Sequence, residues 1–186
     1  MQRRTLLALL SGALLLSPAA PPFAGTPEPG DTLPETDIRV PDRKGRETAI
    51  DTLLGDNGAA ILFIARDCPA ALAGKERIAE LLRGYQARGI ATVVVEVTPR
   101  GAAPTDPSSF EALTYLIDEG GRLAVTLGVL QVPEVLVLDG AGRLAYRGAP
   151  GVGPSGRDLL GDALEAVAER RAPEIDRTEA VGCPLP

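Results

Sequence analysis

The sequence predicts an α/β fold, and three observations carry this prediction. Residues 59–65 (AAILFIA) are an unbroken apolar run, as expected of a strand that is covered on both faces of a sheet, and residues 90–97 (IATVVVEV) indicate a second buried strand. Between them, residues 70–88 repeat apolar side chains at helical spacing and stop before Gly89. A strand, a helix and a second strand in this order form a unit whose two strands run parallel.

Shorter elements are predicted on both sides of this unit. Residues 38–50 alternate apolar and polar side chains around a turn, which predicts a hairpin, and one helical turn follows it. Downstream, the patterns predict a short helix from Pro107, an edge strand at 113–117, a short helix within 119–129, a strand at 134–139, its hairpin partner at 143–148 and an amphipathic helix at 157–171.

The first residues have the pattern of a secretory signal. Arg3 and Arg4 precede an apolar run at 6–16, and Ser17 and Ala19 are small residues that fit a leader-peptidase site. The run is short for a membrane span and no lipidated cysteine follows, so an uncleaved anchor is the less favoured alternative. We therefore expect an exported protein, periplasmic or extracellular, in a compartment where disulfides persist. The paired arginines leave the export route open between the general and the twin-arginine pathways.

Length and composition allow one core domain. The chain has 186 residues, of which 45% are hydrophobic, enough for one core and too few for two ordinary domains. We assign 1–19 to the signal, 20–34 to a lead-in rich in Pro and Gly, 35–171 to the domain and 172–186 to a tail. The formal charge of −6 argues against nucleic acid or an anionic membrane surface as a partner, and no stable membrane insertion is expected after the signal is removed.

Cys68 is the first candidate for chemistry. It stands directly before Pro69, where the strand at 59–65 gives way to the predicted helix. At the first turn of a helix, unpaired backbone N–H groups and the helix dipole stabilise a thiolate, and proline suits that turn because it needs no N–H. The neighbouring charge of Asp67 disfavours a thiolate at Cys68, and the charge of Arg66 offsets that effect. A buried, inert cysteine is the alternative interpretation.

Three segments of the chain carry a family resemblance: LFIARDCP at 62–69, LGVLQVPEVLVLDGAGRLAYRG at 127–148 and TEAVGCPL at 178–185. With the order of elements, they resemble the thioredoxin fold, and more narrowly the redoxin group of the alkyl hydroperoxide reductase and thiol-specific antioxidant superfamily. The resemblance covers residues 29–186. It implies a central mixed β-sheet flanked by helices, with the N-terminal hairpin as an extension.

The resemblance also implies a role for Val132 and Pro133. In such families a cis proline begins the strand beside the reactive sulfur and presents backbone to a substrate cysteine. Here that residue is Pro133, after Val132. From the residues alone, an ordinary trans proline that opens an edge strand is equally acceptable.

The local motif lacks a second thiol. Ala71 occupies the position at which thiol-redox enzymes often carry another cysteine, and Cys183 in the tail is the only other cysteine of the chain. Closing a long loop costs little more entropy than closing a moderate one. We therefore predict a Cys68–Cys183 disulfide in the oxidised state. It is either a redox pair or a permanent staple that stabilises the fold by about 2 to 4 kcal/mol.

Peroxide reduction fits these residues less well. A peroxiredoxin would place a threonine or serine at position 65 and a proline at position 61, but the chain has Ala65 and Ile61, which donate no side-chain hydrogen bond. Arg66 and Arg147 are candidates for electrostatic support of the site, although strand arginines such as Arg147 are often solvated.

Two functions stay open. The chain has no histidine, which excludes His-based triads and His-bearing metal sites, and we expect neither a cofactor nor a metal. One function is an exported thiol-disulfide oxidoreductase that acts on a protein or small-molecule thiol or disulfide, with Cys68 as nucleophile and Cys183 as distal resolving cysteine. The other is a non-catalytic thioredoxin-like domain with a static disulfide. The sequence specifies no substrate, electron donor, direction of electron flow or oligomeric state.

Overall fold

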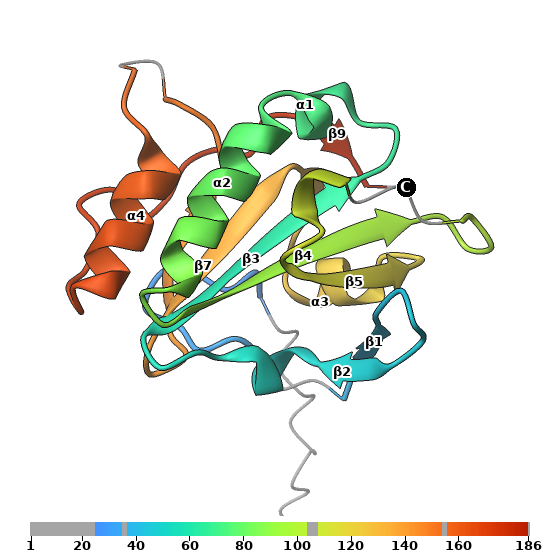
Figure 1. Ribbon diagram of the computed structural model, residues 1–186, viewed down its shortest axis with the longest axis horizontal. Helices are drawn as coiled ribbons and strands as arrows, with labels where there is room; N and C mark the ends of the chain where they lie inside the picture. Colours follow the sequence, from blue (N-terminus) through green and yellow to red (C-terminus); the bar gives the residue numbers. More distant parts are fainter. Residues whose placement is uncertain (1–24, 35–36, 104–107, 154–155, 186) are drawn as a thin grey trace, which may run out of the picture.

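A central five-stranded sheet organises the chain (Figure 1). The computed structural model describes residues 25–34, 37–103, 108–153 and 156–185. The strands lie in the order β5 (Thr114–Glu119), β4 (Ile90–Thr98), β3 (Gly58–Ala65), β7 (Glu134–Asp139) and β8 (Leu144–Gly148). β3, β4 and β5 run parallel, whereas β7 is antiparallel to β3 and to β8. The predicted α/β class and mixed sheet are confirmed.

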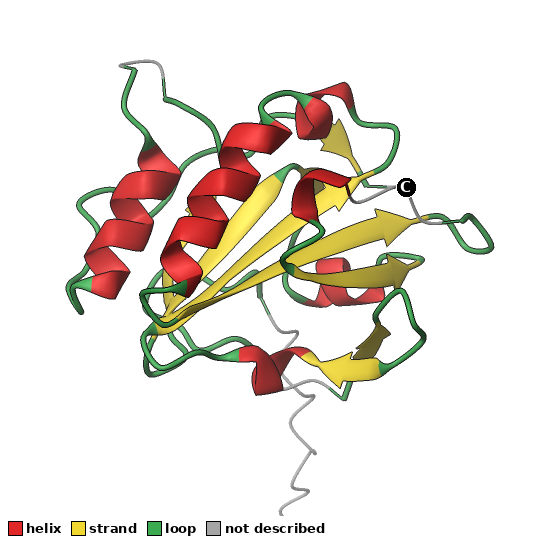
Figure 2. Cartoon of the chain, in the orientation of Figure 1, coloured by secondary structure: helices red, strands yellow, loops and turns green. Residues whose placement is uncertain are grey.

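Helices cover the sheet as the apolar patterns predict (Figure 2). α2 (Lys75–Gln86) packs on β4, and α4 (Leu159–Ala168) packs on β7 and against α2, so the two helices lie side by side over the sheet. α3 (Arg122–Thr126) packs beside β5. α4 is shorter than the predicted 157–171 and begins at its N-cap Asp158, whose carboxylate accepts a hydrogen bond from the Gly161 N–H at 3.1 Å.

The single helix predicted over 70–88 is wrong. The structure has two helices, α1 (Pro69–Leu72) and α2, separated by Gly74 in a left-handed conformation with φ of 72°. A left-handed residue interrupts the hydrogen-bond ladder, and glycine adopts that conformation without the steric cost of a side chain. As a result, the helix that follows Cys68 is only four residues long.

The N-terminal elements lie at two edges of the sheet. β1 (Arg39–Pro41) and β2 (Glu47–Ala49) form the predicted hairpin, which contacts β5, and η1 (Ile50–Leu53) is the predicted helical turn. A second short helix, η2 (Ser108–Phe110), lies before β5. At the opposite edge, Gly30 in the predicted lead-in donates a backbone hydrogen bond to Leu144 of β8 at 2.7 Å.

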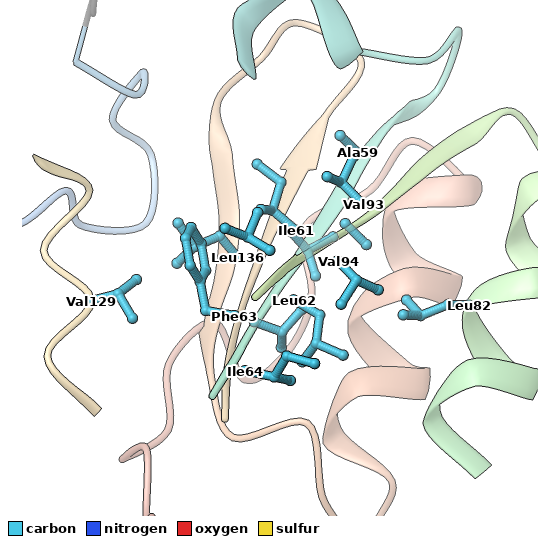
Figure 3. Packing of buried hydrophobic residues seen from close by; sticks show 14 of the residues in the cluster. Ala59, Ile61, Leu62, Phe63, Ile64, Leu82, Val93, Val94, Val129 and Leu136 are labelled. Atoms are coloured by element: carbon cyan, nitrogen blue, oxygen red, sulfur yellow. The ribbon is translucent and has the colours of Figure 1, made fainter. Parts of the chain in front are cut away.

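The core sits between the sheet and its helices (Figure 3). Ile61 and Phe63 of β3, Val94 of β4, Leu136 of β7 and Leu82 of α2 are each at most 1% exposed. Burial of apolar side chains on this scale is the main source of stability for such a sheet. It fixes the end of β3 beside the start of β7, and both ends lead into the site described below.

The predicted signal at 1–19 lies outside the described residues. Among the residues that the structure describes, no helix is both long enough and apolar enough to cross a membrane.

Candidate functional site

A disulfide joins Cys68 to Cys183 across 115 residues of sequence, with their Cα atoms 5.8 Å apart. The predicted pairing is confirmed. Cys68 is 1% exposed, whereas Cys183 is half-buried. The short strand that carries Cys183, β9 (Cys183–Pro184), lies beside α1 near the end of β3 (Figure 1).

Cys68 occupies the N-cap position of α1, with Pro69 as the first helical residue. Its backbone is extended (φ −94°, ψ 109°) and its N–H donates to the Ala65 carbonyl at 3.4 Å. This corrects the expectation that Cys68 lies within the first turn of a long helix. Because α1 has only four residues, its dipole contributes little to stabilising a thiolate. The N–H groups of Ala71 and Leu72 donate to the Cys68 carbonyl.

The tail forms a short strand over Cys68. β9 (Cys183–Pro184) pairs antiparallel with β6 (Gln131–Val132), with Cys183 opposite Val132, and the Leu185 N–H donates to the Leu130 carbonyl at 3.0 Å. The Cys68 sulfur lies 3.3 Å from the Val132 carbonyl oxygen. In the disulfide this sulfur has no proton to donate, but a reduced Cys68 thiol could donate one to this carbonyl.

Pro133 is in cis, as predicted, and the peptide bond it forms with Val132 is the cis bond of the site. Both residues are buried. Gly182 approaches the same peptide: a Cβ placed there would lie 1.9 Å from the Val132 carbonyl oxygen. Only glycine permits this approach of the tail. The sequence contains Gly182 directly before Cys183, but its need is visible only once the tail is seen on β6.

The second local thiol position and the peroxidase positions hold apolar side chains. Ala71 is 4% exposed in α1, and Ile61 is 1% exposed in β3, which ends at Ala65. Arg66 is half-buried in the turn between β3 and Cys68. The described residues around the site thus present one disulfide and no adjacent dithiol.

Arg147 is buried in an ion pair with Glu134, the residue after Pro133. Its Nε and Nη2 lie 2.9 and 2.6 Å from one Glu134 carboxylate oxygen, and its remaining donors reach the carbonyls of Pro27 at 2.8 Å and Gly128 at 3.1 Å. Burial raises the pKa of Glu134, and Arg147 opposes that rise. The sequence suggested a solvated arginine or one that supports the sulfur. Instead, the guanidinium is 3% exposed and its donors are engaged here, so its support of the sulfur stays a prediction.

The tail is fixed at its base, residues 176–178. The Arg147 N–H donates to the Asp176 carbonyl and the Thr178 N–H donates to the Arg147 carbonyl, both at 3.0 Å. Arg147 and Arg177 form a parallel bridge, so the base extends the sheet beyond β8. Backbone pairing along β8 therefore holds this part of the tail in place.

Comparison with solved structures places this arrangement among known folds. A hypothetical protein from Sinorhizobium meliloti superimposes with a TM-score of 0.73 at 20% identity, covering 87% of this chain and 95% of its own. An uncharacterized conserved protein from Geobacillus kaustophilus superimposes with a TM-score of 0.70 at 20% identity, covering 84% of this chain and 90% of its own. A protein from Chlorobium tepidum, described as a thiol:disulfide interchange protein DsbE, superimposes with a TM-score of 0.61 at 21% identity, covering 76% of this chain and 99% of its own.

No family model and no curated protein matches the chain. At these identities the structural matches show the fold alone. The fold is thioredoxin-like, as in solved structures described as thiol-disulfide oxidoreductases, and within it the chain carries the Cys68–Cys183 disulfide.

Proposed function

We propose that this protein is an exported thiol-disulfide oxidoreductase in which Cys68 is the nucleophile and Cys183 the resolving cysteine. The observation that carries the proposal is the disulfide between a strand-end cysteine and a tail cysteine, directly beside cis Pro133. The fold of the solved neighbours supports it. Export rests on the signal pattern at 1–19.

The proposed cycle has two exchange steps. In the reduced protein, the Cys68 thiolate attacks one sulfur of a substrate disulfide, and the other substrate sulfur leaves as a thiolate. The Cys183 thiolate then attacks the Cys68 sulfur of this mixed disulfide. The Cys68–Cys183 bond forms and the second substrate sulfur leaves as a thiolate, so the substrate gains the two electrons that the protein loses. An external dithiol reductant restores the reduced protein, and the reverse sequence oxidises a substrate dithiol.

A static disulfide is the second candidate, and the burial of Cys68 favours it. With 1% exposure, Cys68 is reached by an external thiol only when the tail moves. In that case the bond would act as a staple of a binding or structural domain. A peroxidase stays the weakest reading, because Ala65 and Ile61 carry no hydrogen-bonding side chain.

A glutathione titration separates the two candidates. The mature protein is equilibrated across a series of glutathione redox ratios, and thiols are alkylated and counted by mass spectrometry. We expect the bond to be reduced at potentials that glutathione buffers cover. Structural disulfides typically have reduction potentials below about −300 mV and stay closed in such buffers. Cys183→Ala should accumulate a glutathione adduct on Cys68, and Cys68→Ala is the matched control for adduct position. A bond that stays closed in the native protein at every ratio would overturn the oxidoreductase and leave the staple.

The mass of the protein, measured in each cell fraction, tests whether the leader is cleaved and the protein exported. We expect a mature chain that begins near position 20 in the extracytoplasmic fraction, because cleavage is predicted near Ala19. An intact leader on a cytoplasmic protein would contradict export.

A further inference from the structure

Thr178 ties the base of the tail to β8 through its side chain. The Ala149 N–H donates to the Thr178 hydroxyl at 3.1 Å, and the Tyr146 hydroxyl donates to the Ala149 carbonyl at 2.9 Å. The hydroxyls of Thr178 and Tyr146 lie 2.8 Å apart. Since Tyr146 has one hydroxyl proton and uses it on Ala149, the Thr178 proton goes to Tyr146. These three groups therefore close a ring of hydrogen bonds.

Gly148 makes room for this ring. A Cβ at Gly148 would lie 2.1 Å from the Thr178 hydroxyl oxygen, and the residue has a φ of 150°, which favours glycine. Tyr146 is fully buried, at 0% exposed. The ring is partly buried, and because its donors and acceptors pair with one another it forms a rigid attachment point.

None of these contacts involves a cysteine. The two backbone hydrogen bonds with Arg147 and the ring around Thr178 are independent of the Cys68–Cys183 bond. Reduction of the disulfide therefore leaves the base of the tail in place. Cys183 is then held five residues from a fixed point at Thr178, whereas detachment of the whole base would leave it fifteen residues beyond Ala168, the last residue of α4.

We propose that Thr178 is a positioning residue that keeps Cys183 within reach of Cys68 in the reduced protein. This inference rests on the proposed function, in which Cys183 resolves a mixed disulfide on Cys68. The chance that a flexible tether brings its end to a given point falls roughly as the −3/2 power of its length. Lengthening the tether from five to fifteen residues therefore lowers the effective concentration of Cys183 about fivefold.

The test measures the equilibrium constant between dithiol and disulfide forms in glutathione, together with the rate at which a glutathione adduct on Cys68 is resolved. Thr178→Ser keeps the hydroxyl and should match the native protein. Thr178→Val loses the ring, and Thr178→Pro also loses the N–H that donates to Arg147. We expect both quantities to fall in the order serine, valine, proline, by at most about fivefold at the end of the series, the value for a base that detaches completely.

The control is Thr92→Val, the same exchange at a buried hydroxyl of β4 that has no hydrogen-bond partner within the described structure. It should leave both quantities unchanged. A merely structural role for Thr178 would lower the free energy of unfolding without changing the exchange constant of the folded protein, and that result would overturn this inference alone. A native disulfide that opens at no glutathione ratio would overturn the proposed function, and this inference with it.

Discussion

The base and the tip of the tail are held in opposite ways. The base, residues 176–178, pairs with Arg147 on β8 and closes the ring at Thr178, all through noncovalent bonds. The tip, residues 183–185, lies on β6 through short backbone pairing and is fixed by the disulfide to Cys68. One segment thus combines a noncovalent attachment at its base with a covalent one at its tip.

Removing the buried ion pair of Arg147, the residue whose backbone pairs with the base, should have the largest effect. Arg147→Met leaves the Glu134 carboxylate buried without its partner and frees the carbonyls of Pro27 and Gly128. Breaking one side of a buried ion pair typically costs about 3 to 5 kcal/mol. Urea denaturation should show a loss of this size, and Glu134→Gln combined with Arg147→Met should recover part of it. A loss below about 1 kcal/mol would show that the pair contributes little.

Removing the covalent hold on the tip should have the next largest effect. Cys183→Ala in an oxidising buffer should lower the free energy of unfolding by about 2 to 4 kcal/mol, because the unfolded chain is no longer cross-linked. Adding a reductant that opens the native disulfide should remove most of the difference. Cys68→Ala together with Cys183→Ala should cost no more than either change alone. Additive losses would mean that the cysteines stabilise the fold separately.

Adding a methyl group at Gly182 tests how closely the tip packs on β6. Gly182→Ala places a methyl group 1.9 Å from the Val132 carbonyl oxygen, so the tip must shift. Overpacking of this kind costs about 1 to 3 kcal/mol, and it should appear in the unfolding of the oxidised protein. Gly151→Ala is the matched control, because a Cβ there meets nothing within 4 Å. Equal stabilities for the two variants would contradict the close approach.

A contact remote from the tail should give the smallest effect and no redox dependence. Glu165 of α4 binds Arg88 and Tyr85, and these hydrogen bonds lower its pKa from 4.5 to about 2. A carboxyl with a depressed pKa stabilises the fold above its unfolded value, and this contribution is lost as the pH falls from 4.5 through 2. Glu165→Gln should flatten that part of the curve of unfolding free energy against pH. An unchanged slope would contradict this assignment.

The sequence predicts the parts of this molecule that depend on local pattern. The apolar runs of β3 and β4, the hairpin of β7 and β8 and the cis Pro133 of the family resemblance all lie where expected. The break at Gly74 is missed because an isolated glycine is tolerated within a helical pattern, so the pattern alone gives no reason to stop there.

The sequence predicts the two cysteines of the site, but not the contacts that hold the tail near them. The Cys68–Cys183 bond follows from the absence of any other thiol, but the pairing of Arg147 with Glu134 and the ring at Thr178 depend on contacts between distant segments. No periodicity marks residues 176–178, because their backbone groups pair with the backbone of Arg147 in β8 and no apolar face is buried there in a regular pattern. Gly182 is visible in the sequence, and its role is defined by a carbonyl on β6.

Hydrogen exchange of the native protein before and after reduction tests the two-part tail most directly. Reduction should speed exchange at the Leu185 N–H, which donates to Leu130, and leave the N–H groups of Arg147 and Thr178 protected. That pattern would show a tip released from a base that stays in place. Release of Thr178 together with Leu185, or protection of both after the disulfide has opened, would contradict the account.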